Sequence, residues 1–308
     1  MSGDGTAAGM LQLRDITVAR GGRAVVREVS IDIPAGEVTA LLGPNGAGKS
    51  SLVLAVGGVL RPEAGSVLLA GRNYAGRRPE RIRRAGIAIV PEGRRLLSEL
   101  TVEDNLRVAS YTLSREAAQA GHTRVLELFP ELSRRLTARA RTLSGGEQQM
   151  LVLAQALVSQ PRYILIDELS LGLAPVVINR LVPRIRRAAE SGIGVLLIEQ
   201  FAPVALGLAN RAYIMEGGLL RFCGQATELR AKPELLRSAY LLRGSDALPG
   251  GPPAGPAAPA APAGPAAPAG PAAPAGPAAP AGPAAPAGPA APGGPPTPAD
   301  PPGPAGPA

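Results

Sequence analysis

Residues 43–50 read Gly-Pro-Asn-Gly-Ala-Gly-Lys-Ser, a run of closely spaced glycines that ends in one lysine and one hydroxyl. Such glycines let backbone N–H groups curl around phosphate oxygens, and a helix that starts at the loop directs its positive end toward them. Lys49 is then expected to reach the β- and γ-phosphates of a nucleotide, and the Ser50 hydroxyl to bind Mg²⁺. The predicted nucleotide-binding residues are Gly43, Pro44, Asn45, Gly46, Ala47, Gly48, Lys49, Ser50 and Ser51.

Lys49 is a rare residue type in this chain, because only two of its 32 Lys and Arg residues are lysines. A compact ammonium fits inside a phosphate-binding loop where a planar guanidinium does not. The rarity of lysine therefore favours a functional Lys49 over an incidental one.

Two acids end an apolar run, Tyr-Ile-Leu-Ile-Asp-Glu, at positions 163–168. In nucleotide-hydrolysing sites built on such a loop, the first acid lies near Mg²⁺ and the second orients or deprotonates the attacking water. Apolar runs that end in acids are common, so this pair is informative only because the glycine-rich loop precedes it. We predict Asp167 as a metal residue and Glu168 as a catalytic carboxylate.

A second glycine-containing segment, residues 143–149, reads Leu-Ser-Gly-Gly-Glu-Gln-Gln. Ser144 is a typical helix N-cap, and the residues after it have helical spacing. The paired glycines Gly145 and Gly146, with Glu147 beside them, leave backbone N–H groups open to an anion. One chain needs only one phosphate-binding helix start for its own nucleotide, so the second is predicted to serve the nucleotide of another chain.

The elements that position these residues follow from hydrophobic periodicity. Residues 11–42 read as strands with turns, and short apolar runs at 37–42, 66–71, 87–90, 163–167 and 194–199 read as further strands. Helical patterns follow the loop at 43–50 and fill 101–160, 175–190 and 201–209. The order predicts an α/β fold with a largely parallel, helix-covered sheet and an antiparallel β part at the front.

Composition sets the domain limits and excludes several functions. From about residue 247 onward nearly every residue is Pro, Ala or Gly, which predicts a disordered tail over 247–308. We expect a disordered N-terminus at 1–10 and a nucleotide-binding domain over 11–246, with a helical subdomain at about 93–160.

The net charge is +8, yet aromatics are 3% and no nucleic-acid reader motif is present, so we expect no nucleic-acid partner. One Cys and one His exclude an intrachain disulfide and a His-based triad.

The chain shows neither a signal region nor an apolar run long enough to span a membrane, so any membrane role is expected to be peripheral.

Residues 143–149 resemble the signature of ATP-binding-cassette (ABC) ATPases, whose motif order this chain shares over about residues 11–243. Three strings are similar to the shorter ATP-binding subunit of branched-chain amino acid transporters: VPEGRRLLSELTVEDNL, LSGGEQQM and DELSLGLAP.

This resemblance implies a P-loop NTPase of the ABC type that hydrolyses ATP with Mg²⁺. It implies a head-to-tail dimer with a second ABC ATPase subunit, identical or different, in which Ser144 and Gly146 contact the ATP of the facing molecule. Two membrane permeases and an extracytoplasmic solute-binding protein would complete an importer at the cytoplasmic face of the plasma membrane.

The resemblance also assigns single residues and exposes departures from the general ABC pattern. Glu92 stands where many members have Gln, and is carried over as a sensor of Mg²⁺ and γ-phosphate. Gln200 replaces the usual switch His, and it can hydrogen-bond a phosphate but cannot carry charge. Arg20 stands where an aromatic usually stacks on adenine. Leu169 replaces a proline and is expected to loosen the segment after Glu168.

Three other functions compete with an ATPase that powers an importer. A non-transport ABC ATPase of the repair type would carry long coiled coils, for which the segment between Lys49 and Leu143 leaves no room, and a translation type would carry two cassettes. A regulatory subunit that binds ATP but hydrolyses it weakly remains open because of Leu169 and Gln200. A P-loop kinase would not need the 143–149 segment.

Overall fold

The computed structural model describes residues 9–232, 234 and 236 of the chain. The predicted tail over 247–308, and residues 1–8 of the predicted N-terminal segment, lie outside the described residues. The first strand begins at Met10, one residue before the expected domain start, because Met10 pairs with Pro34 on the neighbouring strand.

An antiparallel four-stranded sheet forms the front of the domain. In spatial order its strands are β2 (Arg23–Pro34), β1 (Met10–Arg20), β4 (Ala64–Leu69) and β5 (Arg72–Asn73). Buried residues alternate with less buried ones over most of β1 and at the end of β4, as expected for a sheet with one face on the core.

A second, six-stranded sheet is mixed. In spatial order it contains β10 (Leu219–Gln225), β9 (Arg211–Glu216), β3 (Val38–Leu42), β8 (Gly194–Glu199), β7 (Tyr163–Asp167) and β6 (Ile87–Val90). All neighbours are parallel except β10, which pairs antiparallel with β9. Strands β3, β7 and β8 are buried along their whole length, because both faces of this sheet are covered.

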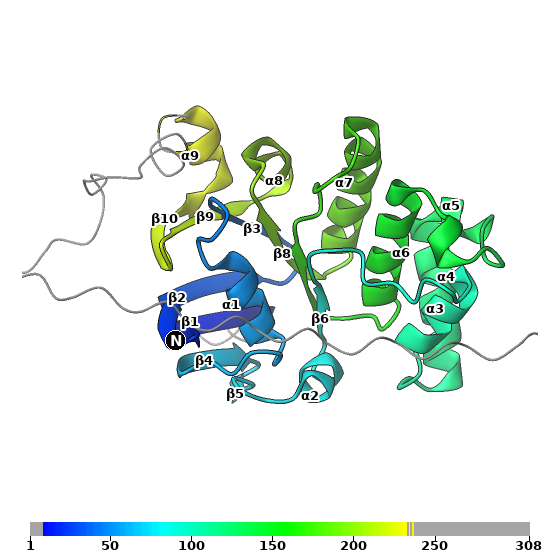
Figure 1. The fold of residues 1–308 in the computed structure, drawn as a ribbon, viewed down its shortest axis with the longest axis horizontal. Coiled ribbons are helices and arrows are strands. Elements are labelled where there is room, and N and C mark those ends of the chain that lie inside the picture. The colour runs from blue at the N-terminus through cyan, green and yellow to red at the C-terminus, as the bar shows by residue number, and fades with distance from the viewer. Residues whose placement is uncertain (1–8, 233, 235, 237–308) are drawn as a thin grey trace, which may run out of the picture. The chain divides into compact units, whose positions relative to one another are not determined.

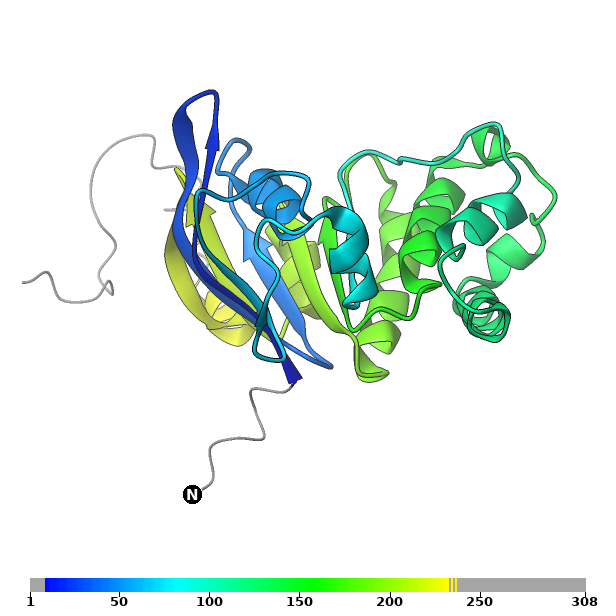
Figure 2. The same ribbon diagram turned by 90° about the horizontal axis from the view of Figure 1, so that it is seen from below.

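Helices flank the second sheet (Figure 1). Their bounds are α1 (Lys49–Val56), α2 (Pro79–Arg84), α3 (Val102–Ala109), α4 (Arg115–Leu128), α5 (Pro130–Ser133), the 3₁₀ turn η2 (Ala140–Thr142), α6 (Gly145–Leu157), α7 (Pro175–Glu190), α8 (Ala202–Leu208) and α9 (Ala226–Ala231). Figures 1 and 2 both show α3, α4 and α5 gathered beyond α6, at the end of the molecule away from β1 and β2.

Two hydrophobic cores lie on the two faces of the second sheet. Along β8, Leu196 and Ile198 point into the core shared with the first sheet and α1, while Val195 and Leu197 point into the core under α6 and α7. The two sheets are also joined by a polar contact, because the backbone N–H of Asp32 donates to the Tyr213 hydroxyl at 3.1 Å.

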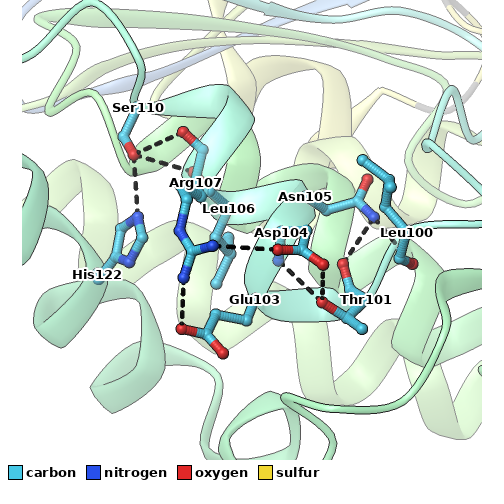
Figure 3. A network of polar contacts seen from close by, with 9 residues as sticks. All are labelled: Leu100, Thr101, Glu103, Asp104, Asn105, Leu106, Arg107, Ser110 and His122. Atoms are coloured by element: carbon cyan, nitrogen blue, oxygen red, sulfur yellow. Dashed lines mark hydrogen bonds and ion pairs between the residues drawn. The ribbon is translucent and has the colours of Figure 1, made fainter.

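Polar contacts organise the helical end of the molecule (Figure 3). Thr101 caps α3 by accepting from the Asp104 N–H at 3.0 Å, as its position before two acids predicts. Fully buried Asn105 bonds both the N–H and the carbonyl of Leu97, each at 3.0 Å, and thereby fixes the loop that leads into α3. His122, half-buried, lies 3.0 Å from the Ser110 hydroxyl and joins α4 to the end of α3.

The predicted fold class is confirmed: an α/β P-loop domain of the ABC type, with a mixed sheet, an antiparallel β part and inserted helices. In the described part of the chain, no helix combines the length and the apolarity needed to cross a bilayer.

Candidate functional site

The predicted phosphate-binding loop connects β3 to α1, as its position between an apolar run and a helical pattern indicates. Gly43, Gly46 and Gly48 have positive φ angles of 156°, 81° and 106°. A Cβ on Gly43 would overlap the Met215 carbonyl, and one on Gly48 would overlap the carbonyl of Val25. The loop is therefore held against β9 and β2 at positions where only glycine fits.

Backbone hydrogen bonds join the β9–β10 turn to the same loop and to β2. The Gly218 N–H donates to the Ala47 carbonyl at 3.0 Å, and the Gly218 carbonyl accepts from the Arg27 N–H at 2.8 Å. Helix α1 starts at Lys49 with no side-chain cap on its first N–H groups. A preformed loop and an uncapped helix start together suit an anion such as phosphate.

Lys49 is the first residue of α1 and is 4% exposed, with its side chain folded back onto this loop. Its ammonium donates to the Gly43 carbonyl at 2.7 Å and to the Pro44 carbonyl at 3.0 Å. Burial lowers its pKa, and four nearby carboxylates act against that lowering: Glu168, Asp167, Glu199 and Glu92. The structure thus brings the predicted lysine and the three predicted acids into one electrostatic cluster.

Asp167 ends β7 and is 3% exposed. Burial raises its pKa to about 6, although a hydrogen bond with the Ser50 side chain acts in the opposite direction. Its Oδ1 atom is buried without a hydrogen-bond partner. A buried carboxylate oxygen that lacks a partner, beside a serine hydroxyl, is a donor set that fits a hard divalent cation.

The described residues contain no group of three or more His, Cys, Asp or Glu side chains arranged to hold a metal ion alone. Mg²⁺ is commonly held by one or two carboxylates together with substrate phosphates and water. Ser50 and Asp167 therefore fit this mode of binding, with Glu92 close enough for its charge to act on the Asp167 carboxyl.

Glu168 follows Asp167 and has a left-handed backbone, with φ of 54°. Its N–H donates to the Ile198 carbonyl of β8 at 2.9 Å. Glu168 and Gln200 line the same cavity, of about 530 Å³, which lies between the carboxyl ends of β7 and β8. The two residues predicted to act on water and on the γ-phosphate thus border one cavity.

Leu169 is completely buried and belongs to the core under α6 and α7. Its side chain anchors the segment after Glu168 to the core, and the expectation that leucine loosens this segment relative to proline stays a prediction.

Glu92 lies just after β6 and is exposed. Two residues further on, Arg94 donates to the Gly172 carbonyl at 3.2 Å. A Cβ on Gly145 would stand 3.0 Å from the Arg94 guanidinium. Arg94 therefore connects the Glu92 segment, the segment after Glu168 and the first turn of α6.

Ser144 caps α6 as predicted, and Glu147 completes a capping box. The Ser144 hydroxyl accepts from the Glu147 N–H at 3.3 Å, and a Glu147 carboxylate oxygen accepts from the Ser144 N–H at 2.9 Å. The charge acting on Glu147 is that of Arg135, with which it forms an ion pair at 3.3 Å. The start of α6 is therefore held by its own capping hydrogen bonds, and the charge that acts on Glu147 comes from Arg135.

Arg20 ends β1 at the hairpin that β1 forms with β2, and its side chain is exposed. Val25, on the same hairpin, packs against Gly48 of the phosphate-binding loop. Arg20 is thus on the element that borders the loop, which is compatible with the predicted contact to a base.

Residues 26–170 match the family model described as ABC transporter. The high-affinity branched-chain amino acid transport ATP-binding protein BraG of Pseudomonas aeruginosa is 40% identical over 231 residues, which cover 75% of this chain and 99% of that protein. The probable branched-chain amino acid transport ATP-binding protein LivF of Archaeoglobus fulgidus is 35% identical, over 67% of this chain and 87% of that one.

Other relatives move different cargo, and the fold has solved counterparts. The lipopolysaccharide export system ATP-binding protein LptB of Escherichia coli is 31% identical, over 71% of this chain and 92% of that protein. A solved ATP binding subunit of an ABC transporter is 31% identical and has a TM-score of 0.65, over 75% of this chain and 96% of that one.

Proposed function

The chain belongs to the ABC transporter family of ATP-binding subunits, and from this premise we propose that it is the ATP-hydrolysing subunit of an importer for branched-chain amino acids. The convergence of Lys49, Asp167, Glu168 and Glu92 on one glycine-rich loop is the observation that carries the hydrolytic part. The amino acid cargo rests on similarity to BraG and LivF, since an ATPase subunit does not contact the cargo.

In the proposed binding mode, the backbone N–H groups of residues 43–51 surround the phosphates of ATP. Lys49 exchanges its two carbonyl partners for the β- and γ-phosphates. Ser50 and Asp167 would hold Mg²⁺, with Glu92 nearby, and Arg20 would contact the adenine. The bound ion would supply charge neutralisation between the β- and γ-phosphates.

Glu168 orients a water molecule against the γ-phosphorus and accepts its proton as the new P–O bond forms. The bond between the γ-phosphorus and the bridging oxygen breaks, and its electron pair stays on ADP. Gln200, at the same cavity, contacts the γ-phosphate oxygens. Such a reaction is accelerated mainly by positioning and charge stabilisation.

The α6 start completes the site of a facing ATPase subunit, identical or different. Ser144, Gly145, Gly146 and Glu147 form a preformed helix start whose charge partner is Arg135 rather than the local phosphate-binding loop. Closure of two such subunits around ATP would then be transmitted to two membrane permeases, with a solute-binding protein on the outer side. This arrangement places the subunit peripherally at the cytoplasmic face of the plasma membrane.

One variant tests the hydrolytic role. Glu168→Gln should bind ATP with unchanged affinity and lose nearly all turnover, because the amide cannot accept the proton of the attacking water. Phosphate release and equilibrium ATP binding are measured on the full chain assembled with its partner ATPase and permeases. Glu190→Gln, the same substitution at an exposed position ending α7, serves as the matched control and should resemble the wild type. Wild-type turnover by Glu168→Gln would contradict the assignment.

Transport is tested in vesicles that contain the complete complex, with uptake of labelled leucine, isoleucine and valine compared with uptake of urea and amides. ATP-dependent uptake of the branched-chain amino acids alone supports the proposed cargo. The second candidate function is a regulatory subunit that binds ATP but hydrolyses it weakly, because Gln200 stands in place of the usual switch His. Undiminished turnover of the complex carrying Glu168→Gln in this chain, with the partner ATPase intact, would favour it.

A further inference from the structure

Glu199, the last residue of β8, is a buried carboxylate that takes no part in the proposed binding of ATP or in its hydrolysis. It is 1% exposed, and burial raises its pKa. Burying a carboxylate is unfavourable unless several hydrogen bonds stabilise it. The contacts that stabilise this one indicate what it does.

The Glu199 carboxylate joins two loops that are distant in sequence. One of its oxygens accepts from the Ser170 N–H at 2.9 Å, and the other accepts from the Ser170 hydroxyl at 2.7 Å. The N–H of Phe201 also donates to this carboxylate. Charge-assisted hydrogen bonds of this kind are stronger and more directional than neutral ones.

Each bonded residue stands next to a residue of the proposed catalytic site. Ser170 lies two positions after Glu168, and Phe201 directly follows Gln200. Glu168, Ser170, Glu199, Gln200 and Phe201 all line the same cavity. The relative position of Glu168 and Gln200 across the cavity is thus set by the loops that Glu199 connects.

The backbone of Glu168 requires such support. A non-glycine residue with φ of 54° is in a strained conformation that persists only where surrounding contacts over-determine it. One such contact is the hydrogen bond from the Glu168 N–H to the Ile198 carbonyl. The second such contact is the pair of hydrogen bonds from Ser170, two positions after Glu168, to the Glu199 carboxylate.

We propose that Glu199 is a positioning residue, whose carboxylate clamps Ser170 to Phe201 and thereby holds Glu168 and Gln200 at their working separation. This inference rests on the proposed ATPase function for its kinetic consequences. An electrostatic role is the competing explanation, because Glu199 is also among the carboxylates whose charge acts on Lys49. Substitutions that separate charge from hydrogen bonding distinguish the two.

Ser170→Ala removes one hydrogen bond of the clamp and leaves the Glu199 charge in place. We expect its kcat to fall about ten-fold with ATP affinity unchanged, because misplacing a catalytic group slows the chemical step without affecting binding. Ser170→Thr, which keeps the hydroxyl, should restore kcat to near the wild-type value. Ser191→Ala is the matched control, because the Ser191 hydroxyl donates only locally, to the Ala188 carbonyl at 2.7 Å.

Glu199→Gln removes the charge and retains the shape, and its amide can donate to the Ser170 hydroxyl. It should therefore lose less kcat than Ser170→Ala, with ATP affinity unchanged. The double variant should be slower than either single variant, because the buried amide then lacks its hydroxyl partner. Reduced ATP affinity in Glu199→Gln together with wild-type kinetics in Ser170→Ala would overturn the clamp in favour of the electrostatic role.

Hydrogen exchange gives a readout that does not depend on hydrolysis. In Ser170→Ala, the amide of Phe201 should exchange faster than in the wild type although the substitution is in another loop. If the wild type fails to hydrolyse ATP but this coupled exchange is found, the proposed function fails and the clamp stands. If hydrolysis and the Glu168→Gln variant behave as expected but Ser170→Ala matches the wild type in kcat and in exchange, the clamp fails alone.

Discussion

Asp167 carries a conflict between stability and function that can be measured directly. Its folded-state pKa is raised from 3.8 to about 6 by burial, so the ionised carboxylate disfavours the folded state in the absence of nucleotide and metal. The raised value corresponds to roughly 3 kcal/mol. Because the group is 3% exposed, solvent screening reduces this cost little.

Asp167→Asn should therefore stabilise the nucleotide-free protein at pH 7 by up to roughly 3 kcal/mol, while abolishing Mg²⁺-dependent turnover. The free-energy cost of the buried Asp167 charge depends on pH because the pKa is raised in the folded state. Below the unfolded-state pKa of 3.8 the carboxyl is protonated in both the folded and the unfolded protein, so this cost vanishes. The cost grows as the pH rises through about 6.

Thermal unfolding of Asp167→Asn and wild type in metal-free buffer between pH 5 and 8 checks this expectation. The difference in Tm should widen from acid to neutral pH and then remain constant. Glu190→Gln, an exposed carboxylate, provides the control with little difference at any pH. A variant no more stable than the wild type at pH 7 would show that the buried charge costs nothing.

Residue types and spacing were sufficient to predict residues that the structure gathers around the glycine-rich loop. Lys49, Asp167 and Glu168 belong to short local patterns, and the structure brings them together because β3 and β7, parallel strands on the two sides of β8, end at the same edge of the sheet. Glu199 was missed because its partner Ser170 lies in a loop that is distant in sequence, and Asn105 was missed because its partners in the preceding segment form no motif. The signal available for Glu199 was a carboxylate ending an otherwise apolar strand.

At the scale of single elements, helices α4 and α6 both begin with a serine N-cap, so the effect of removing each cap can be compared. The Ser144 hydroxyl accepts from the Glu147 N–H at 3.3 Å, and the Ser114 hydroxyl accepts from the Ala117 N–H at 3.2 Å. Removing either cap should cost about 1 kcal/mol of stability. Only the α6 start is proposed to contact the nucleotide of a facing subunit.

Ser144→Ala and Ser114→Ala should therefore lower Tm by similar amounts and differ in activity. We expect Ser144→Ala to reduce ATP hydrolysis by the assembled complex and Ser114→Ala to leave it unchanged. Differential scanning calorimetry and phosphate release, measured on the same preparations, separate the two effects. Equal activities in the two variants would mean that Ser144 acts only as a helix cap.

The elements themselves were largely predictable where periodicity was strong. The strands at 87–90, 163–167 and 194–199 and the helix at 175–190 match β6, β7, β8 and α7. Strands β9 and β10 were not anticipated, although the β9–β10 turn supports the phosphate-binding loop through Gly218. The position of both strands depends on the pairing of β9 with β3, which lies far away in sequence and which no local pattern reveals.

At the scale of the whole molecule, the order of strands was beyond local patterns. The predicted separation into a parallel sheet and an antiparallel front part is confirmed, because runs of alternating and of continuous burial have different sequence signatures. The central position of β3, between β8 and β9, arises from pairing over long sequence distances. Motif order supplied what periodicity could not, since it placed the chain in a family of known architecture.

Deleting residues 248–308 tests whether the described domain carries the whole ATPase. Among the described residues, the members of both hydrophobic cores and the residues packed on them fall between Leu11 and Leu236, outside the deleted segment. The deleted segment contains one charged residue, Asp300, and almost no side chain larger than proline, so it offers little apolar surface or charge to contribute. The truncated chain should therefore retain the Tm, kcat and ATP affinity of the full chain. A lower Tm or kcat in the truncated chain would instead require that the Pro/Ala/Gly segment packs on the domain and helps to hold the cavity lined by Glu168 and Gln200.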